Sequence, residues 1–385
     1  MRGAHPVRAA VAATLAGALV LAGTASAAEA GGRSGLQSAV DDLHAIGITG
    51  VQGLSRAGGR TTTARSGVAN VDTGAPVPLN GYFRMGSDTK TFVSVVLLQL
   101  VGEGRLSLDD PVQRWLPGVV SGNGNDGRKI TVRELLQHTS GIANYTDDLS
   151  ALGSAEGYRA HRFDHYEAAD LVALAMKHPP LFAPGTSWSY SNTNYILVGM
   201  IINKVTGRSW AREVDDRVLV PLHLHQTYVP GDDATLRNPH AEGYNQFTPG
   251  GPLVDTTVFN PTVADAAGSM VSTPTDLARF WTALQSGRLL APAQMAQMHR
   301  TVPAPGLSDA FPGARYGLGV MWITDRCGGF WSHGGDVPGM STINGVSPDA
   351  KRVVVLSLST ELADQTSELA IYKRAHELID DTFCQ

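Results

Sequence analysis

The sequence predicts a mixed α/β (α+β) fold in which one antiparallel sheet is built from both ends of the chain. Residues 50–56 and 61–69 are predicted strands joined by a glycine turn, and residues 342–346 and 352–359 are predicted strands near the C-terminus. Between them lie separate helical segments that proline, glycine and aspartate interrupt. Strands at both ends with helices between them imply a single sheet with a mostly helical region inserted into it.

Each predicted helix has a local signal. Residues 36–46 have the apolar period of a helix, and residues 361–382 are predicted to form a closing helix. Thr131 and Glu134 have the spacing of a capping box, which satisfies backbone N–H groups at a helix start. A further helix is predicted to end at Gly287.

The length of 385 residues suggests two folding units rather than one. We predict an α/β domain formed by residues 33–105 and 265–385, and a mostly helical inserted domain formed by residues 106–264. The groove between two such units is a common place for a ligand pocket. We therefore expect catalysis, if there is any, in that groove.

Residues 1–27 have the features of a secretory signal peptide. Arg2 and Arg8 flank an apolar stretch on its N-terminal side, and a small-residue cleavage site ends at Ala27. The apolar run is too short to favour a membrane span, so we expect a secreted protein with no membrane partner after cleavage. The net charge of −5 and the lack of a lysine-rich run argue against nucleic acid as a partner.

Ser87 and Lys90 stand at the start of the most apolar helical stretch in the chain. Gly86 interrupts the preceding segment, so a helix that begins near Ser87 places the hydroxyl and the amine on one face. A helix that is apolar all round is buried, and burial favours the neutral amine of Lys90, a base for Ser87. The alternative is a serine N-cap beside a solvated lysine.

Two later segments strengthen the catalytic interpretation. The turn Tyr190–Asn192 carries hydroxyls and an amide just before an apolar helix at residues 196–205. The stretch His333–Gly335 is glycine-rich and is predicted to be a strand edge, where a ligand can approach closely. Taken separately, each segment has an ordinary alternative as a capping turn or a turn histidine. Their order after a Ser-x-x-Lys that opens a buried helix favours a catalytic set.

The three motifs resemble those of the penicillin-recognising serine hydrolases. The chain is most similar to the secreted D-alanyl-D-alanine carboxypeptidases of actinomycetes and to related class C β-lactamases and esterases. The resemblance also includes residues 130–142, 266–277 and 316–319. It implies the β-lactamase/transpeptidase-like fold and a small peptide, ester or β-lactam substrate, including cell-wall peptidoglycan stems. No cofactor and no metal are expected, and we expect a monomer.

The resemblance implies acyl transfer through an ester on Ser87. Lys90, or a pair of Lys90 and Tyr190, would take the serine proton, and Tyr190 would protonate the leaving group and later activate water. Asn192 would orient Lys90. Since a phenol is a poor base, Tyr190 is expected to lie among positive groups such as Lys90 and His333.

The oxyanion hole is expected from the backbone N–H groups of Ser87 and Asp336, with Gly334 and Gly335 beside it. His333 takes the place of a lysine found in the β-lactamases. With a pKa of about 6.5, His333 would give the rate profile an acid limb.

In the carboxypeptidase relatives, an arginine and hydroxyl groups hold the terminal carboxylate of the substrate. The arginine position here is Met321, and the hydroxyl positions are Gly334 and Asp336. An acidic side chain there would repel a carboxylate. Three interpretations stay open: a D-alanyl-D-alanine carboxypeptidase-like hydrolase; a related esterase, D-amino-acid amidase or weak β-lactamase; and a catalytically silent penicillin-binding protein.

Cys327 and Cys384 are the only two cysteines in the chain. An exported protein favours a disulfide between them, and the resembled relatives have such a bridge in the same place. The alternative is two unpaired thiols. His161 and His165 have partial metal-ligand spacing, but without a third ligand a solvated helix face is the better interpretation.

Overall fold

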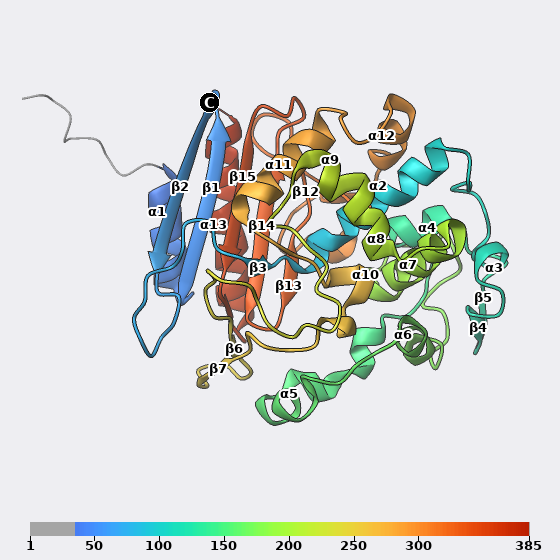
Figure 1. The fold of residues 1–385 in the computed structure, drawn as a ribbon, viewed down its shortest axis with the longest axis horizontal. Coiled ribbons are helices and arrows are strands. Elements are labelled where there is room, and N and C mark those ends of the chain that lie inside the picture. The colour runs from blue at the N-terminus through green and yellow to red at the C-terminus, as the bar shows by residue number, and fades with distance from the viewer. Residues whose placement is uncertain (1–34, 385) are drawn as a thin grey trace, which may run out of the picture. The chain divides into compact units, whose positions relative to one another are not determined.

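Strands from the first and last parts of the described chain meet in one large sheet, as Figure 1 shows for the computed structural model, which describes residues 35–384. Within these residues the sheet has nine strands in the order β2-β1-β15-β14-β12-β11-β10-β9, with β13 paired to β14 alone, and its pairs are antiparallel. The strands are β1 (Gly50–Ala57), β2 (Arg60–Gly67), β9 (Val302–Pro303), β10 (Arg315–Tyr316), β11 (Met321–Ile323), β12 (Phe330–Ser332), β13 (Gly335–Val337), β14 (Met340–Val346) and β15 (Val353–Leu358). The predicted sheet from both ends is confirmed.

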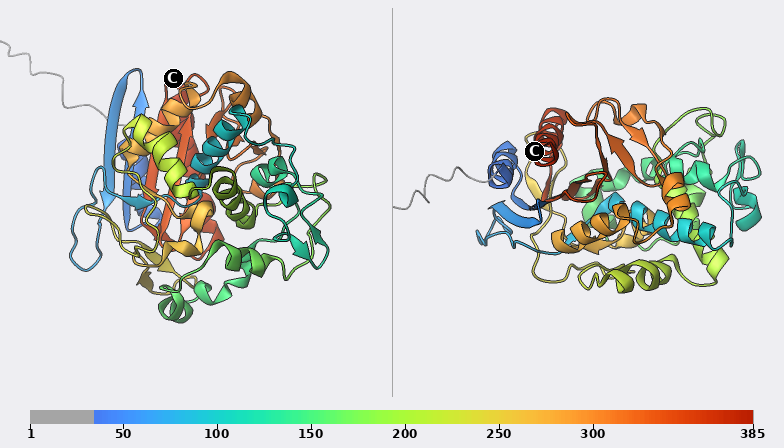
Figure 2. Two further views of the ribbon diagram at one scale, coloured as in Figure 1. Left: turned by 45° about the vertical axis from the view of Figure 1, so that its right-hand side comes forward. Right: turned by 90° about the horizontal axis from the view of Figure 1, so that it is seen from above.

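Helices cover both faces of this sheet (Figure 2). The N-terminal helix α1 (Gly35–Ile46) and the closing helix α13 (Gln365–Phe383) pack together on one face, and α11 (Pro274–Gln285) packs on the other. The central strand β15 is buried along its whole length. Its alternate side chains join the two different cores, Val354 and Leu356 on one side and Val353 and Val355 on the other.

The second core is helical and centres on α2 (Thr89–Gly102) and α7 (Asn192–Thr206). The other helices are α3 (Val112–Trp115), α4 (Val132–Gln137), α5 (Ala155–His161), α6 (Ala168–Ala175), α8 (Trp210–Val214), α9 (Val220–Leu222), α10 (Asp265–Gly268) and α12 (Pro292–Met298). Small sheets join β3 (Phe83–Arg84) to β8 (Val271–Ser272), β4 (Ser121–Gly122) to β5 (Asn125–Asp126), and β16 (Thr360–Glu361) to β6 (Tyr244–Gln246) and β7 (Leu253–Asp255).

Most of the predicted helix limits agree with the structure, and two helix starts are wrong. The helix predicted to begin at residue 196 is α7, which begins at Asn192. The capping box at the start of α4 is confirmed, with the Glu134 N–H donating to Thr131 Oγ1 at 3.3 Å and the Thr131 N–H donating to Glu134 Oε2 at 2.7 Å. The closing helix begins later than predicted because residues 360–361 pair with β6 and Asp364 caps the helix instead.

Two predictions stay as they were. The predicted signal peptide at residues 1–27 lies outside the described residues. The division into an α/β domain and an inserted helical domain also stays a prediction.

None of the helices in residues 35–384 combines the length and apolarity that a membrane crossing requires.

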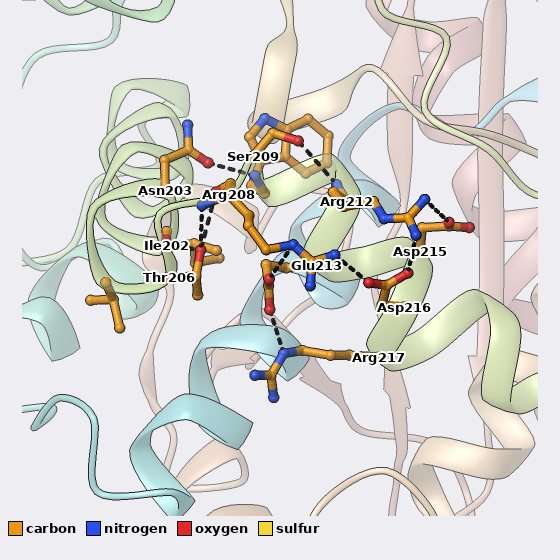
Figure 3. Close-up of polar contacts among 12 residues, drawn as sticks. Ile202, Asn203, Thr206, Arg208, Ser209, Arg212, Glu213, Asp215, Asp216 and Arg217 are labelled. Carbon is orange, nitrogen blue, oxygen red and sulfur yellow. Dashed lines mark hydrogen bonds and ion pairs between the residues drawn. The ribbon is translucent and has the colours of Figure 1, made fainter.

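An ion-pair network fixes the C-terminal end of α2. The carboxylate of Glu213 is buried and forms ion pairs with Arg217 at 2.5 Å and with Arg208 at 3.3 Å, as Figure 3 shows. Arg217 also pairs with Glu103, the residue that follows α2. Because several charges share partners, the network restrains α2 more than one exposed pair would.

Cys327 and Cys384 form a disulfide that ties the turn between β11 and β12 to the residue after α13. We expect the double variant Cys327→Ser/Cys384→Ser to lose up to about 4 kcal/mol of unfolding free energy, because the bridge closes a long loop in the unfolded chain. Urea unfolding followed by circular dichroism measures the loss. An unchanged midpoint would show that the bridge does not stabilise the fold.

Candidate active site

The structure places Ser87 where the sequence predicts it, at the N-terminal end of the buried helix α2. A single 3₁₀ turn, Gly86–Asp88, precedes α2, and Gly86 has φ +52° in the left-handed region that glycine adopts without strain. Lys90 follows in the first turn of α2 with no exposed surface. Its Nζ lies 2.9 Å from Ser87 Oγ, so the expected pair is formed.

The amine of Lys90 has three neighbours, and two of them can only accept hydrogen bonds. Its Nζ lies 2.7 Å from Asn192 Oδ1 and 2.7 Å from the carbonyl oxygen of Ala267. A neutral amine has two N–H donors and one lone pair. With both donors used on these acceptors, the lone pair faces Ser87 Oγ and can accept its proton.

Burial lowers the pKa of Lys90 well below its usual value of 10.5, and no carboxylate opposes this. This shift favours the neutral amine, in the direction that the sequence predicts. The Nζ also lies 4.8 Å from the centre of the Tyr190 ring. Lys90 is therefore near three other residues of the motifs: Ser87, Asn192 and Tyr190.

Tyr190 lies in the loop before α7, and its side chain lies close enough to Ser87 to affect the pKa of the phenol. Desolvation raises its pKa well above 10, although the Ser87 contact acts in the opposite direction. Tyr190 lies beside Lys90 and His333, as the sequence predicts, but burial lowers the pKa of both groups, which weakens them as positive partners. Tyr190 is a proton donor that can relay a proton, not a resident anion.

His333 lies in the turn between β12 and β13 and is almost completely buried. Its Nδ1 lies 2.7 Å from the carbonyl oxygen of Gly334, which only accepts, so Nδ1 carries the proton. Its Nε2 lies 2.8 Å from the Tyr316 hydroxyl, which then donates to it. Burial lowers the His333 pKa to about 3, and Lys90 adds to this effect. The expected acid limb from a histidine of ordinary pKa is therefore wrong.

The proposed oxyanion hole depends on Gly86 and Gly335, which let the backbone before Ser87 lie against the backbone of β13. A Cβ on Gly335 would lie 2.1 Å from the oxygen of Met85 and 2.4 Å from the nitrogen of Ser87. A tight turn after Val337 joins β13 to β14, and along these strands hydrogen-bonded residue pairs alternate with non-hydrogen-bonded pairs. Asp336 and Ser341 form a non-hydrogen-bonded pair, so the Asp336 N–H points away from β14, toward the opposite edge of β13.

Two residues that the sequence analysis missed hold this edge in place. Asn344 in β14 donates to both carboxylate oxygens of Asp88, at 2.8 and 2.9 Å, and to the carbonyl oxygen of His333. Its Oδ1 accepts the His333 N–H at 3.4 Å. Burial raises the pKa of Asp88 well above 3.8. A carboxyl group at the start of an apolar helix is the signal that would have pointed to this contact.

A pocket of about 220 Å³ opens in front of Ser87. Asn192 and Asp336 line it beside the nucleophile, and most of the rest of the wall is apolar. Its other lining residues are Tyr145, Thr146, Leu149, Leu152, Phe259, Val263, Ala264, Ala267, Gly268, Val337 and Pro338. The pocket can therefore hold an acyl group with an uncharged side chain against the nucleophile.

The family model described as Beta-lactamase matches residues 36–378. The chain belongs to the beta-lactamase family. Its members include serine hydrolases that act by acyl transfer, which agrees with the arrangement of Ser87, Lys90 and Tyr190.

Relatives of several activities share this family. Penicillin-binding protein 4 of Amycolatopsis lactamdurans is 30% identical over 70% of each chain. The solved D-stereospecific amidohydrolase from Streptomyces sp. is 40% identical, with a TM-score of 0.81 over 88% of this chain and 97% of that one. The D-amino acid amidase from Ochrobactrum anthropi SV3 is 28% identical, with a TM-score of 0.78 over 90% of this chain and 98% of that one.

A second pocket, of about 250 Å³, adjoins the catalytic one in this beta-lactamase family member, and Asp336 lines both. We call it the acidic pocket because Asp336, Glu361 and Glu368 line it together with Tyr372. Burial and the nearby Asp336 raise the pKa of Glu361 to about 7, and burial raises that of Asp336. Among the described residues that line the two pockets there is no lysine, arginine or histidine.

Met321 does not take part in either pocket. It lies in β11 opposite Ser332 and is packed into the core, with 6% of its surface exposed. The position where the resemblance places a carboxylate-binding arginine is therefore filled by an apolar core side chain.

The acid limb of the rate profile is expected to belong to Lys90. A base acts only when unprotonated, so kcat/KM should fall as the pH falls through the lowered Lys90 pKa. His333, neutral above a pH of about 3, adds no limb between pH 5 and 8. In His333→Gln the rate with a nitrophenyl ester should fall while the midpoint of the limb stays in place. A limb that disappears in this variant would assign it to His333 instead.

We expect Gly335→Ala to lower kcat by about 100-fold or more, the effect of losing an oxyanion donor. The new Cβ would meet the backbone of Met85 and Ser87 and push β13 away from the nucleophile. Gly334→Ala is the matched control, because its Cβ comes no closer than 3.0 Å, to the Thr342 oxygen. Equal losses in the two variants, measured by ester hydrolysis, would contradict this assignment.

Proposed function

We propose that this serine hydrolase cleaves amides and esters of amino acids that carry a free amino group and an uncharged side chain, with a preference for the D configuration. One observation carries the proposal. Asp336, whose carboxylate accepts a hydrogen bond from Tyr372 at 3.3 Å, lines both the pocket before Ser87 and the acidic pocket, and no basic side chain lines either pocket among the described residues. An ammonium group is attracted to such a wall, and a terminal carboxylate is repelled.

In the acylation step, Ser87 Oγ attacks the carbonyl carbon of the substrate as its proton passes to the lone pair of Lys90. The backbone N–H groups of Ser87 and Asp336 hold the negative oxygen of the tetrahedral intermediate. The bond from carbon to the leaving nitrogen or oxygen then breaks, and the leaving group takes a proton from Tyr190. Lys90 returns a proton to Tyr190, so the site ends neutral with an ester on Ser87.

Deacylation repeats these steps with water in place of serine. Water attacks the ester carbon and loses a proton to the Lys90 amine, directly or through Tyr190. The bond to Ser87 Oγ breaks, and the proton returns to that oxygen. The products are an amino acid and the regenerated hydroxyl, and no group is oxidised or reduced.

The amino group of the substrate would lie near Asp336 and the acidic pocket. Glu361 and Asp336 raise one another's cost of ionisation, as the Glu361 pKa of about 7 indicates. A bound ammonium group would relieve that repulsion, so the empty pocket is electrostatically suited to a cation. The preference for the D configuration is supported by two similar structures, the D-stereospecific amidohydrolase and the D-amino acid amidase.

A D-alanyl-D-alanine carboxypeptidase-like activity is the second candidate. The similarity to penicillin-binding protein 4 of Amycolatopsis lactamdurans supports it, whereas Met321 and Asp336 weigh against it. We also propose that the protein is secreted and acts as a monomer. The disulfide between Cys327 and Cys384 supports an oxidising compartment.

A panel of small substrates tests the proposal on the purified protein. We expect D-phenylalanine amide to be hydrolysed with kcat/KM at least about tenfold above its L isomer and above N-acetyl-D-phenylalanine amide, a difference near 1.4 kcal/mol each. Asp336→Asn should lower kcat/KM for the free amino substrate and change that for the acetylated one less. Ser87→Ala, which lacks the nucleophile, should lose several orders of magnitude on every substrate.

A peptide ending in D-Ala-D-Ala and a fluorescent penicillin complete the panel. If the peptide is cleaved with a higher kcat/KM than D-phenylalanine amide, the carboxypeptidase candidate replaces the amidase. If neither amide, ester nor peptide is cleaved but the penicillin labels Ser87, the protein is a silent penicillin-binding protein.

A further inference from the structure

His138 is a buried histidine beside the catalytic residues that the mechanism above does not use. It is the C-cap of α4 and has φ +60° and ψ 33°, in the left-handed region. Glycine is common at the end of a helix in this conformation, and a β-carbon there strains the backbone. The chain therefore keeps a side chain at a position where glycine would be free of strain.

The ring of His138 lies in the middle of an aromatic cluster with no exposed surface. Its nearest aromatic neighbour is the catalytic Tyr190, with ring centres 4.3 Å apart and planes tilted by 34°. The other rings around it are Tyr316 at 4.8 Å, Tyr195 at 5.4 Å and Trp188 at 6.1 Å. Tyr316 is the residue that donates to His333, so His138 touches the supports of both later motifs.

The hydrogen bonds of His138 define its proton. Its Nδ1 accepts the backbone N–H of Ser191 at 3.3 Å and lies 3.1 Å from Asn194 Nδ2. Ile142 N–H donates to Ser140 Oγ, which donates to Asn194 Oδ1, so the Asn194 amide presents its NH₂ to His138. Both contacts to Nδ1 are donors, so the ring is neutral and its proton lies on Nε2.

The Nε2–H has no hydrogen-bond partner among the described residues. A buried donor without a partner is unfavourable, and it adds to the backbone strain at the same residue. Burial lowers the His138 pKa well below 6.5, and a positive charge on Lys90 or His333 would lower it further. The groups that face the ring, these two and the tyrosines, thus leave it uncharged at neutral pH.

We propose that His138 is a positioning residue for Tyr190. It accepts the N–H of Ser191, the next residue in the chain, and packs its ring against the phenol, which together hold the Tyr190 hydroxyl beside Ser87. This inference rests on the proposed seryl-ester mechanism. It predicts that loss of the Nδ1 acceptor disturbs proton transfer through Tyr190 more than it disturbs substrate binding.

Two variants separate the acceptor from the ring. His138→Phe keeps an aromatic ring and removes the acceptor, whereas His138→Asn keeps an acceptor and tolerates the left-handed backbone. With a nitrophenyl ester, we expect His138→Phe to lower kcat by about 10- to 100-fold with KM changed by less than about threefold. His138→Asn should recover at least half of the loss on a logarithmic scale. Titration of Ser87 with a fluorophosphonate normalises each rate to folded sites.

The pH profile gives a readout that a purely structural role would not move. The Tyr190 ring lies 4.8 Å from Lys90 Nζ, so its displacement would let water reach the amine, raise the Lys90 pKa and move the acid limb of kcat in His138→Phe to higher pH. If titrated His138→Phe keeps the wild-type kcat and limb, or if the Asn variant is impaired as strongly as the Phe variant, the inference is overturned.

A third variant covers a failure to fold. His138→Gly removes the backbone strain, so a purely structural cap would leave its titrated kcat unchanged, and that result would also overturn the inference. A fall in its kcat at constant KM supports the positioning role. The proposed function fails separately, if the wild-type protein forms no ester on Ser87 that mass spectrometry detects.

Discussion

The chemistry of this protein depends on one buried amine. Lys90 is enclosed by the apolar helix α2, and its two N–H donors are taken by acceptors that cannot give a proton back. Its lone pair is left to Ser87 as a result of this geometry. If water reached the amine, the charged form would return and the serine would lose its base. The packing of α2 against α7 and α10 is therefore a condition of catalysis as well as of stability.

The parts of the site that the sequence predicts well are those formed by contacts between residues close together in the sequence. Ser87 and Lys90 meet because a helix begins between Gly86 and Thr89, and glycine and apolar residues announce that start. Several contacts between residues distant in the sequence were missed. The clamp of Asn344 on Asp88 joins positions 256 residues apart.

The pKa of His333 shows the same limit. Its type predicts ordinary titration, whereas burial and the donated hydrogen bond from Tyr316 keep it neutral. The same burial weakens His333 as a positive neighbour of Tyr190. The sheet was predicted because strands alternate locally. The late start of α13 was missed because the pairing of residues 360–361 with β6 has no local signal.

The pairing of β1 with β15 brings together residues separated by most of the chain, and Thr49 bonds to Thr360 across 311 positions. During synthesis β1 can pair with β2 at once, but its other edge must wait for β15 until the last segment leaves the ribosome. This exposed edge is meanwhile open to wrong partners. A ribosome that stops before β15 would release a product unable to close its sheet, so quality control, rather than partial activity, would decide the fate of such a fragment.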